Sequence, residues 1–245
     1  MSGRGTIRIG TSGWNYDHWK GPFYPDDLAQ KDWLAFYAER FPTVEVNNTF
    51  YQLPEKKTVR AWLDDAPDDF VFAVKASRYI THMKKLKDPK ESLRRFLEAT
   101  EVFGDRLGPV LFQLPPSWNV NEERLAMFLE ALPDDLRCAF EFRDESWFND
   151  DIMELLRSHG SAFCVYHLAG RRSPKEVTAD FTYVRLHGPG DKYEGSYDQR
   201  ALSGWAGAFS SWADKGLDVF CYFDNDDSGY AAKNAGSLAE MLDAR

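Results

Sequence analysis

The 245-residue chain has few cysteines and no long apolar run. Its three cysteines, Cys138, Cys164 and Cys221, fall within predicted strands, in an odd number and at spacings unlike those of a zinc knuckle. We therefore expect small buried core residues in a reducing compartment, not a disulfide framework or a cysteine metal site. No apolar segment has the length of a membrane span, and residues 1–8 lack the apolar region of a signal peptide. The expectation is a cytoplasmic protein without membrane contact.

Several motifs of phosphate and nucleotide chemistry are also missing. The chain has no glycine-rich phosphate loop, no dinucleotide-binding fingerprint and no G-x-S-x-G nucleophile elbow. Positive charge is in deficit as well, since the formal net charge is −9 at pH 7. This balance argues against a surface that coats nucleic acid, although it is compatible with a local basic cleft. One basic cluster follows the third predicted strand and consists of Arg78, Lys84, Lys85 and Lys87. It is either part of a solvated loop or an electropositive rim that attracts an anionic substrate.

What the chain does contain is a regular series of eight short apolar runs, nearly all of which end in polar or charged residues. A buried strand that turns polar only at its C-terminal tip is typical of a parallel barrel, whose site lies at that end. Helical periodicity between the runs, with caps at Asn121 and Asn149, predicts repeated β/α units. The runs are Ile7–Ser12, Val44–Asn48, Phe70–Ser77, Val110–Gln113, Cys138–Arg143, Phe163–His167, Phe181–His187 and Val219–Asn225.

The predicted fold class is therefore α/β, a single (β/α)8 TIM-type barrel domain over residues 1–245. Such barrels contain about 250 residues, and no low-complexity tract or Gly/Ser linker marks a second domain. The connection between the sixth and seventh strands is short and contains Pro174, so we expect an irregularity there in place of a full helix. The predicted helices are Gln30–Phe41, Lys56–Ala66, Asp88–Phe103, Asn121–Leu132, Asn149–His159, Ser203–Lys215 and Ala231–Leu242.

Side chains two residues apart on a strand face the same way, and this alternation separates the strand tips into two sets. One set is apolar, as at Val46 and Phe142, and suits packing against the helices. The other set is polar and must point into the barrel near its top. Buried charges are costly unless they are paired or open to water, so these residues form either a substrate pocket or an ion-pair network that fills the barrel top. The charged members are Glu45, Lys75, Glu141, Arg143, Arg185, His187 and Asp224.

Seven segments at and before the strand tips carry distinctive residue patterns. They are Ile7–Trp14, Glu45–Tyr51 (E-V-N-N-T-F-Y), Phe72–Ser77, Phe112–Pro116 (F-Q-L-P-P), Glu141–Trp147 (E-F-R-D-E-S-W), Arg185–Gly188 (R-L-H-G) and Tyr222–Asn225 (Y-F-D-N). Together and in this order they resemble the YecE-like family, also called domain of unknown function 72. The resemblance implies a TIM-type barrel but no particular reaction, because that family has no settled activity. Asp224 stands where family members often carry asparagine, so this chain has an additional carboxylate there.

The catalytic candidates are Glu45, Glu141 and His187. Arg143 shares a strand face with Glu141, so it either keeps that carboxylate ionised or positions a substrate anion. Two carboxylates across a barrel mouth are the groups that glycoside hydrolysis uses, but carboxylates also recur as structural partners of arginine, so this reaction is not the preferred one. His187 is a candidate general base, general acid or metal ligand, or else a buried hydrogen-bonded residue.

The substrate-binding candidates combine cations, amides and aromatic rings at the strand ends. Lys75 is a phosphate ligand or a partner of Glu45 or, if neighbouring cations lower its pKa, a Schiff-base lysine. The aromatic rings either stack on sugars or bases or anchor their loops. The predicted set is Trp14, Asn47, Tyr51, Lys75, Gln113, Arg143, Trp147, Arg185, Asp224 and Asn225.

No metal site is predicted, and the cofactor is left open. Carboxylates and an imidazole at the strand tips are suitable ligand types for a divalent metal, but no short-range spacing such as H-E-x-x-H supports a site. The residues concerned are Glu45, Glu141, His187 and Asp224.

We therefore expect an enzyme that binds a small polar, anionic substrate at the C-terminal mouth of the barrel, with hydrolase or phosphoesterase chemistry preferred. A carbohydrate, a phosphate ester and single-stranded nucleic acid all fit this description, and the net charge disfavours the nucleic acid. The alternative is a non-catalytic module that binds a nucleic acid or a metabolite in the same pocket. The sequence does not indicate an oligomeric state.

Overall fold

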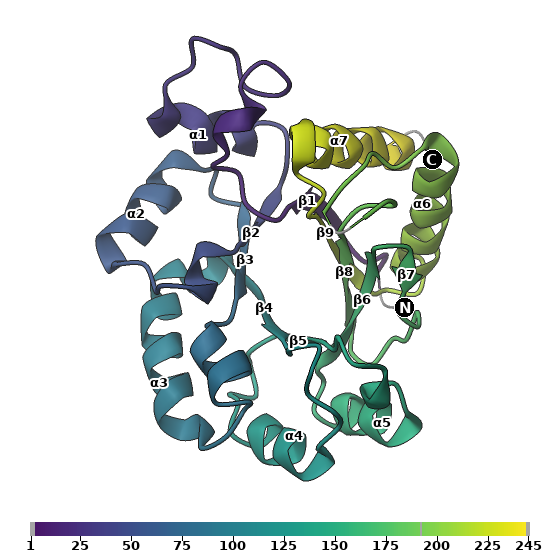
Figure 1. Cartoon of the computed structure of the whole chain (residues 1–245). Coiled ribbons are helices and arrows are strands. Elements are labelled where there is room, and N and C mark those ends of the chain that lie inside the picture. Colours follow the sequence, from purple (N-terminus) through teal and green to yellow (C-terminus); the bar gives the residue numbers. More distant parts are fainter. Residues whose placement is uncertain (1–2, 192, 244–245) are drawn as a thin grey trace.

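The computed structural model describes residues 3–191 and 193–243. Eight parallel strands form the inner ring of a TIM-type barrel, and the helices lie around the outside of this ring (Figure 1). The predicted fold class is thus confirmed, and each predicted apolar run overlaps one of these strands. They are β1 (Ile7–Thr11), β2 (Thr43–Val46), β3 (Val71–Lys75), β4 (Leu107–Gln113), β5 (Cys138–Glu141), β6 (Ala162–Leu168), β8 (Phe181–Leu186) and β9 (Asp218–Phe223).

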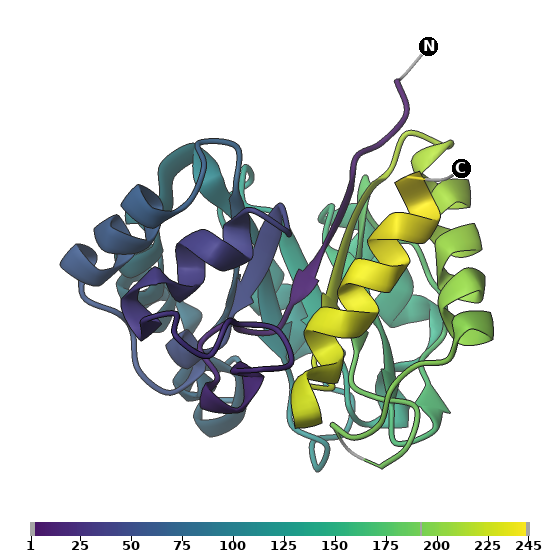
Figure 2. The same cartoon turned by 90° about the horizontal axis from the view of Figure 1, so that it is seen from above.

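Seven α-helices occur in the described residues, one for each predicted helical segment. Asn121 caps α4 by accepting a hydrogen bond from the Arg124 amide (2.8 Å), and Asn149 caps α5 by accepting one from the Ile152 amide (3.0 Å). The helices are α1 (Trp33–Ala38), α2 (Lys56–Asp65), α3 (Pro89–Thr100), α4 (Glu122–Leu129), α5 (Asp150–Ser158), α6 (Gln199–Ala213) and α7 (Tyr230–Asp243). Figure 2 shows the two longest of them, α6 and α7, side by side along the C-terminal strands.

The expected irregularity lies between β6 and β8, where a short hairpin takes the place of a helix. Strand β7 (Arg171–Arg172) turns back and pairs antiparallel with the end of β6. The turn places Ala169 and Gly170 at positive φ, and Pro174 follows the hairpin. Because β6 and β8 still pair in parallel, the ring continues past this point.

The ring closes between β1 and β2 through a seam in place of a full strand ladder. The strand order runs from β1 through β9 round to β2, and a single bridge, Ser12 to Glu45, joins these two ends of the sheet. At the top of the seam the Gly13 amide donates to the Glu45 carbonyl (2.9 Å). Lower down, the Tyr37 hydroxyl accepts from the Thr11 amide (2.8 Å) and donates to the Thr43 carbonyl (3.0 Å). A side chain therefore completes the pairing that the backbone leaves open.

Two apolar cores confirm the alternation expected at the strands. The outer core lies between ring and helices and contains Val46, Phe72 and Phe142. The inner core fills the barrel below its mouth with small and aromatic residues: Ala73, Leu111, Ala139, Ala162, Cys164, Phe181, Tyr183, Phe220 and Tyr222. All three cysteines are buried and free. Within residues 3–191 and 193–243, none of the helices combines the length and apolar character that a bilayer span requires.

Candidate functional site

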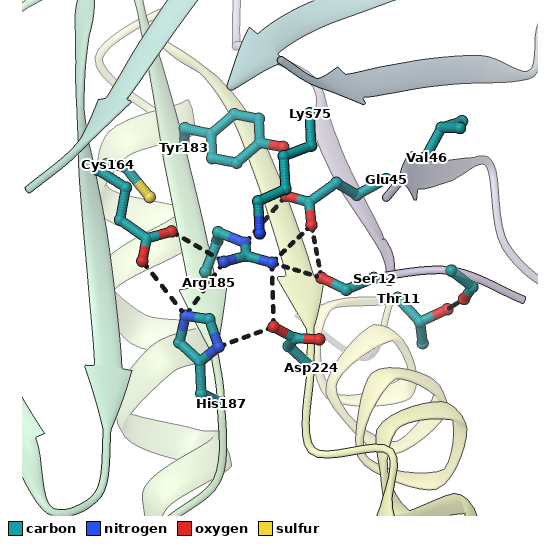
Figure 3. A network of polar contacts seen from close by, with 12 residues as sticks. Thr11, Ser12, Glu45, Val46, Lys75, Cys164, Tyr183, Arg185, His187 and Asp224 are labelled. Atoms are coloured by element: carbon teal, nitrogen blue, oxygen red, sulfur yellow. Dashed lines mark hydrogen bonds and ion pairs between the residues drawn. The ribbon is translucent and has the colours of Figure 1, made fainter. Parts of the chain in front are cut away.

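The carboxyl ends of the strands bring five charged or titratable side chains from four strands together above the inner core. We call Glu45, Glu141, Arg185, His187 and Asp224 the arginine cluster, because the other four surround Arg185. Figure 3 shows Glu45, His187 and Asp224 around Arg185. Each comes from the inward set of the alternation: Tyr183 belongs to the inner core, so Arg185 and His187 on the same strand face point inward above it. The structure thus brings together five residues that the alternation in the sequence had placed in one inward-facing set.

Arg185 is the centre of the cluster, and its side chain is only 1% exposed. Nε and Nη2 donate to the two carboxylate oxygens of Glu45, at 3.0 and 2.8 Å. Nη1 donates to Glu141 Oε2 at 2.8 Å, and Nη2 also reaches Asp224 Oδ2 at 3.0 Å. The planar guanidinium thus serves three carboxylates at once, a geometry that a lysine could not reproduce. Arg185 was predicted to bind a substrate anion, but its donors are already used within the protein.

Glu45 is fully buried and accepts hydrogen bonds from residues at the end of β1 and on β8. Ser12 Oγ donates to Oε1 and the Tyr183 hydroxyl donates to Oε2, each at 2.7 Å. Burial, followed by the nearby Glu45 charge, raises the pKa of Tyr183 well above its usual value, so this hydroxyl stays protonated and donates. With Arg185, every oxygen of this carboxylate is satisfied, as a buried charge requires.

His187 is fully buried, with its two ring nitrogens in opposite environments. Nδ1 lies 2.8 Å from Asp224 Oδ2, which accepts its proton. Nε2 lies 3.1 Å from Arg143 Nη2 and 3.4 Å from Arg185 Nη1. Because arginine nitrogens only donate, this arrangement favours an Nε2 with a free lone pair that accepts from Arg143. An Asp–His pair with the proton on Nδ1 is a frequent arrangement for acid–base catalysis.

Arg143 covers the outer side of the cluster. Its Nε is paired with Glu141 Oε1, and its guanidinium lies over the Tyr166 ring, 5.2 Å from the ring centroid. The side chain is 6% exposed, compared with 1% for Arg185 and 0% for Glu141. Arg143 is therefore the arginine of this group that lies nearer to solvent and to an incoming ligand.

The electrostatics of the cluster keep Glu141 and Asp224 ionised. Burial alone would raise the pKa of Glu141, but Arg143 and Arg185 outweigh it and hold this pKa well below its usual value. Burial of Asp224 is likewise outweighed, mainly by Arg185, and its pKa is lowered. Arg185 loses solvation but gains more from Glu45 and Glu141, so its own pKa is raised. An ionised Glu141 does not act as a general acid, and its two oxygens are paired with Arg143 and Arg185.

A second group of side chains, which we call the lysine side, flanks the cluster on the β3 edge of the mouth. It consists of Lys75, Phe50, His82 and Arg78. The Lys75 Nζ lies 4.6 Å from the centroid of the Phe50 ring, and the His82 ring lies 5.0 Å from the same ring. Burial and then the cations of Lys75 and Arg78 lower the pKa of His82 to about 4, so this imidazole is neutral near pH 7. Part of the predicted basic rim therefore does adjoin the mouth.

The three carboxylates converge on a guanidinium in place of a metal ion. Among the described residues, no group of three or more His, Cys, Asp or Glu side chains has the arrangement of a metal site. Arg185 supplies the positive charge that Glu45, Glu141 and Asp224 need, with N–O contacts of 2.8 to 3.0 Å. Beside this cluster, the Arg143 Nη2 and the His187 Nε2 lie 3.1 Å apart.

Three predicted substrate-binding residues lie away from the cluster, around a separate groove. The groove has a volume of about 570 Å³ and runs between the loop after β1 and helices α1 and α2. Trp14 packs against Trp62 in an edge-to-face contact, with centroids 5.3 Å apart, while Tyr51 is 74% exposed at the rim. Asn47 also lines the groove, and its buried Oδ1 has no hydrogen-bond partner among the described residues.

The other three candidates occupy different positions. Gln113 ends β4 in register with Glu141 and is half-buried at the mouth. Trp147 is fully buried in the outer core, where it stacks on Phe142 (centroids 4.8 Å apart). Asn225 is buried too, and its Nδ2 donates to the Gly195 carbonyl (2.8 Å) and to Asn234 Oδ1 (2.9 Å). Only Gln113 of these faces the cluster.

Sequence reasoning missed three residues that contact the cluster. Ser12 and Tyr166 lie within the predicted runs Ile7–Ser12 and Phe163–His167 and follow the inward alternation of β1 and β6, so applying the alternation to these two runs as well would have found them. Tyr193, whose ring centroid lies 5.5 Å from that of His187, comes from the loop after β8. No periodicity in the sequence indicates that position.

A family model described as "Protein of unknown function DUF72" matches residues 8–245 of the chain. Among curated proteins, the UPF0759 protein YunF of Bacillus subtilis (strain 168) is 28% identical over 270 aligned residues, covering 97% of this chain and 95% of YunF. The UPF0759 protein YecE of Escherichia coli (strain K12) is 32% identical over 116 residues, covering 47% of this chain and 43% of YecE.

Solved structures give the same family and the same fold. A DUF72 family protein from Thermotoga maritima MSB8 superposes with a TM-score of 0.89 at 30% identity, covering 97% of this chain and 99% of that one. A second DUF72 protein, from Enterococcus faecalis V583, gives a TM-score of 0.83 at 20% identity, covering 97% and 96% of the two chains. A glycoside hydrolase family 5 enzyme from Prevotella bryantii B14 is similar at a TM-score of 0.54 and 11% identity, covering 98% and 96%, which shows a shared fold alone.

Proposed function

The chain belongs to the DUF72 family, and we propose that it is an enzyme that binds a polar, anionic substrate at the carboxyl ends of its barrel strands. The reaction we prefer is hydrolysis of a phosphate ester by acid–base chemistry. His187 acts on protons and Asp224 fixes its orientation, while Arg143 and Lys75 hold the anion. The observation that carries this proposal is the position of His187, whose Nδ1 faces a carboxylate at 2.8 Å and whose Nε2 faces a guanidinium at 3.1 Å.

Arg143 couples substrate binding to the base. In the unliganded arrangement its Nη2 faces the His187 Nε2, which keeps that lone pair occupied. An anion is a stronger acceptor for a guanidinium than a neutral imidazole nitrogen is, since both partners are then charged. Binding of the anion therefore draws Arg143 outward and frees Nε2 to accept a proton from water. Hydrolysis follows when this water attacks the phosphorus atom: a new P–O bond forms, the P–O bond to the alcohol breaks, and the departing alkoxide takes the proton from His187 Nε2. The same cations hold the developing charge.

The experiment compares turnover with binding in matched variants. We expect the wild-type protein to hydrolyse a member of a panel of phosphomonoesters and phosphodiesters, and His187→Asn to retain binding but lose about 10²–10⁴-fold in kcat. Arg143→Gln should instead raise KM, because it removes a ligand of the anion. Arg94→Gln, on the exposed face of α3, is the control and should leave both parameters unchanged. Full turnover by the double variant Glu141→Gln/His187→Asn contradicts the proposal.

A non-catalytic binding module is the second candidate, favoured by the near-complete burial of the cluster. Glu141 and His187 have fully buried side chains, which is typical of a structural network. In that case, Glu141→Gln changes affinity for the bound anion while no substrate in the panel is turned over. Equilibrium binding of inorganic phosphate to the wild type and Glu141→Gln, measured beside the turnover assay, separates the two candidates.

A further inference from the structure

Lys75 is placed at the mouth by the same alternation that builds the arginine cluster. Ala73, two residues earlier on β3, belongs to the inner core, so the Lys75 side chain also points inward, one layer higher. Figure 3 shows its side chain reaching toward Arg185 and Glu45. The residue is half-buried, so its amine adjoins the cluster without being sealed inside it.

The carboxylates of the cluster leave Lys75 without a counter-ion. Within the described residues, no carboxylate oxygen lies within 4.0 Å of its Nζ. Glu45 is held by Arg185 on both oxygens, Glu141 by Arg185 and Arg143, and Asp224 by Arg185 and His187. The contact of Nζ that the structure shows is the Phe50 ring, 4.6 Å away at its centroid. An ammonium in this position is held by a cation–π contact, while a guanidinium beside it opposes its charge.

The protonation of Lys75 follows from this position. Burial and then the Arg185 charge lower the pKa of Lys75 to about 8. About half of such an amine is neutral at pH 8, whereas well under 1% of an ordinary lysine is. A neutral amine is the reactive form toward carbonyl carbons, and lysines in such surroundings are the ones that form Schiff bases.

We propose that the unpaired amine of Lys75 is a nucleophile that forms an imine with an anionic aldehyde or ketone bound at the barrel mouth. The amine lone pair attacks the carbonyl carbon, a C–N bond forms, and the carbonyl oxygen takes up a proton to give a carbinolamine. The C–O bond then breaks, water leaves, and the nitrogen gives up its remaining proton, so that amine and carbonyl yield imine and water with no change of oxidation state. This activity goes beyond ester hydrolysis and does not require it.

The anionic character of the carbonyl compound follows from the surroundings of the amine. Arg143 lies at the mouth with its guanidinium over Tyr166, and Arg78 is exposed at the end of β3. Burial and then the charges of Lys75, Arg78 and Arg143 lower the pKa of His82, so these three cations act on the same part of the mouth. A carboxylate or phosphate group on the substrate is held there by the two arginines, which leaves the carbonyl carbon to face the lysine.

The test is reductive trapping with glyoxylate, a small anionic aldehyde, and sodium borohydride, followed by peptide mass spectrometry. At pH 8 we expect one adduct per chain, on Lys75, forming about tenfold faster than on the exposed Lys57. The neutral fraction alone favours Lys75 by about a hundredfold, and the lower basicity of the amine removes part of that advantage. Lys75→Arg keeps the charge and should abolish the fast adduct. Equal labelling of Lys75 and Lys57 overturns the proposal.

A second measurement uses the wild-type protein alone and does not depend on the folding of a variant. Competitive labelling of amines with acetic anhydride across a pH series reports the titration of each lysine. We expect the reactivity of Lys75 to have its midpoint about two pH units below that of Lys57, in line with the lowered pKa. A midpoint equal to that of Lys57 overturns the proposal, because it removes the neutral amine on which imine formation depends.

Discussion

The two sides of the barrel mouth differ in how completely their charges are paired. In the arginine cluster, three carboxylates surround one guanidinium at 2.8–3.0 Å, and Arg185 is 1% exposed. On the lysine side, Lys75 has an aromatic ring as its contact, and burial together with the nearby cations lowers the pKa of His82. A completely paired cluster holds geometry but offers few free groups, whereas an incompletely paired one costs stability and keeps groups available for a ligand. The comparison predicts opposite effects of removing a cation from each side.

The largest effect is expected for Arg185→Met. This change leaves three carboxylates without their shared cation, two of them fully buried, and breaking a buried ion pair from one side costs about 3–5 kcal/mol. Urea denaturation at pH 7 should show a loss of about this size in the free energy of unfolding. Arg94→Met on the exposed face of α3 serves as the control and should unfold as the wild type does. A loss below about 1 kcal/mol would mean that the cluster contributes little to the fold.

Glu141→Gln is expected to have a smaller effect that depends on pH. The folded pKa of Glu141 lies well below its unfolded value, so its ionised form stabilises the protein above the unfolded pKa, and this stability is lost as the pH falls through the folded pKa. At pH 7 we expect a loss of about 2–3 kcal/mol. The free energies of unfolding of the wild type and the variant should converge as the pH is lowered below about 4, measured by urea denaturation at each pH. A difference that does not change with pH contradicts this account.

Lys75→Met should act in the opposite direction. The folded pKa of Lys75, about 8, is below the unfolded value, so the charged ammonium lowers the free energy of unfolding at pH values below 8. We expect the Met variant to be more stable than the wild type by about 1–3 kcal/mol at pH 7. The difference should shrink between pH 8 and about pH 10.5, where the wild type folds without the ammonium charge. A destabilised Met variant at pH 7 would show that Lys75 is paired as well as the arginines are.

The smallest effect is expected for Tyr51→Ala at the rim of the separate groove. Tyr51 is 74% exposed, and exposed substitutions away from special contacts usually change the free energy of unfolding by no more than about 0.5 kcal/mol. Thermal unfolding should therefore be unchanged. A clear loss of stability would show that this ring packs within the loop after β2. That result would favour the loop-anchoring role over stacking on a substrate.

The fold and the centre of the site could be predicted from sequence because both depend on one short-range rule. Alternation along each strand separates Val46 and Phe142 from Glu45 and Glu141, and the parallel order of the strands brings the polar tips to one end. The pairing of particular cations with particular carboxylates could not be predicted in this way. Whether Arg185 or Lys75 takes the carboxylates depends on distances between strands, which no pattern within a strand contains.

The loops show the same limit. Trp14, Asn47 and Tyr51 follow strand tips as the cluster residues do, yet they lie around a groove beside α1 and α2, because the loops after β1 and β2 turn outward. Trp147 follows β5 closely but enters the outer core, where its indole donates to the Trp118 carbonyl at 2.7 Å. A residue on a strand has its direction set by the pleat, whereas a residue on a loop has its direction set by the packing of the whole loop.

The seam between β1 and β2 gives Glu45 a consequence beyond its charge. Elsewhere the ring is held by ladders of backbone hydrogen bonds, but here Ser12 to Glu45 is the bridge and the Tyr37 hydroxyl fills in below it. A junction made of few backbone contacts opens locally at a lower free energy than a ladder does. Amide hydrogen exchange should therefore be faster at Thr11 and Gly13 than along β8. Each such opening also exposes the buried carboxylate of Glu45 to water. Local opening of the barrel wall at the seam and entry of water into the mouth are therefore coupled.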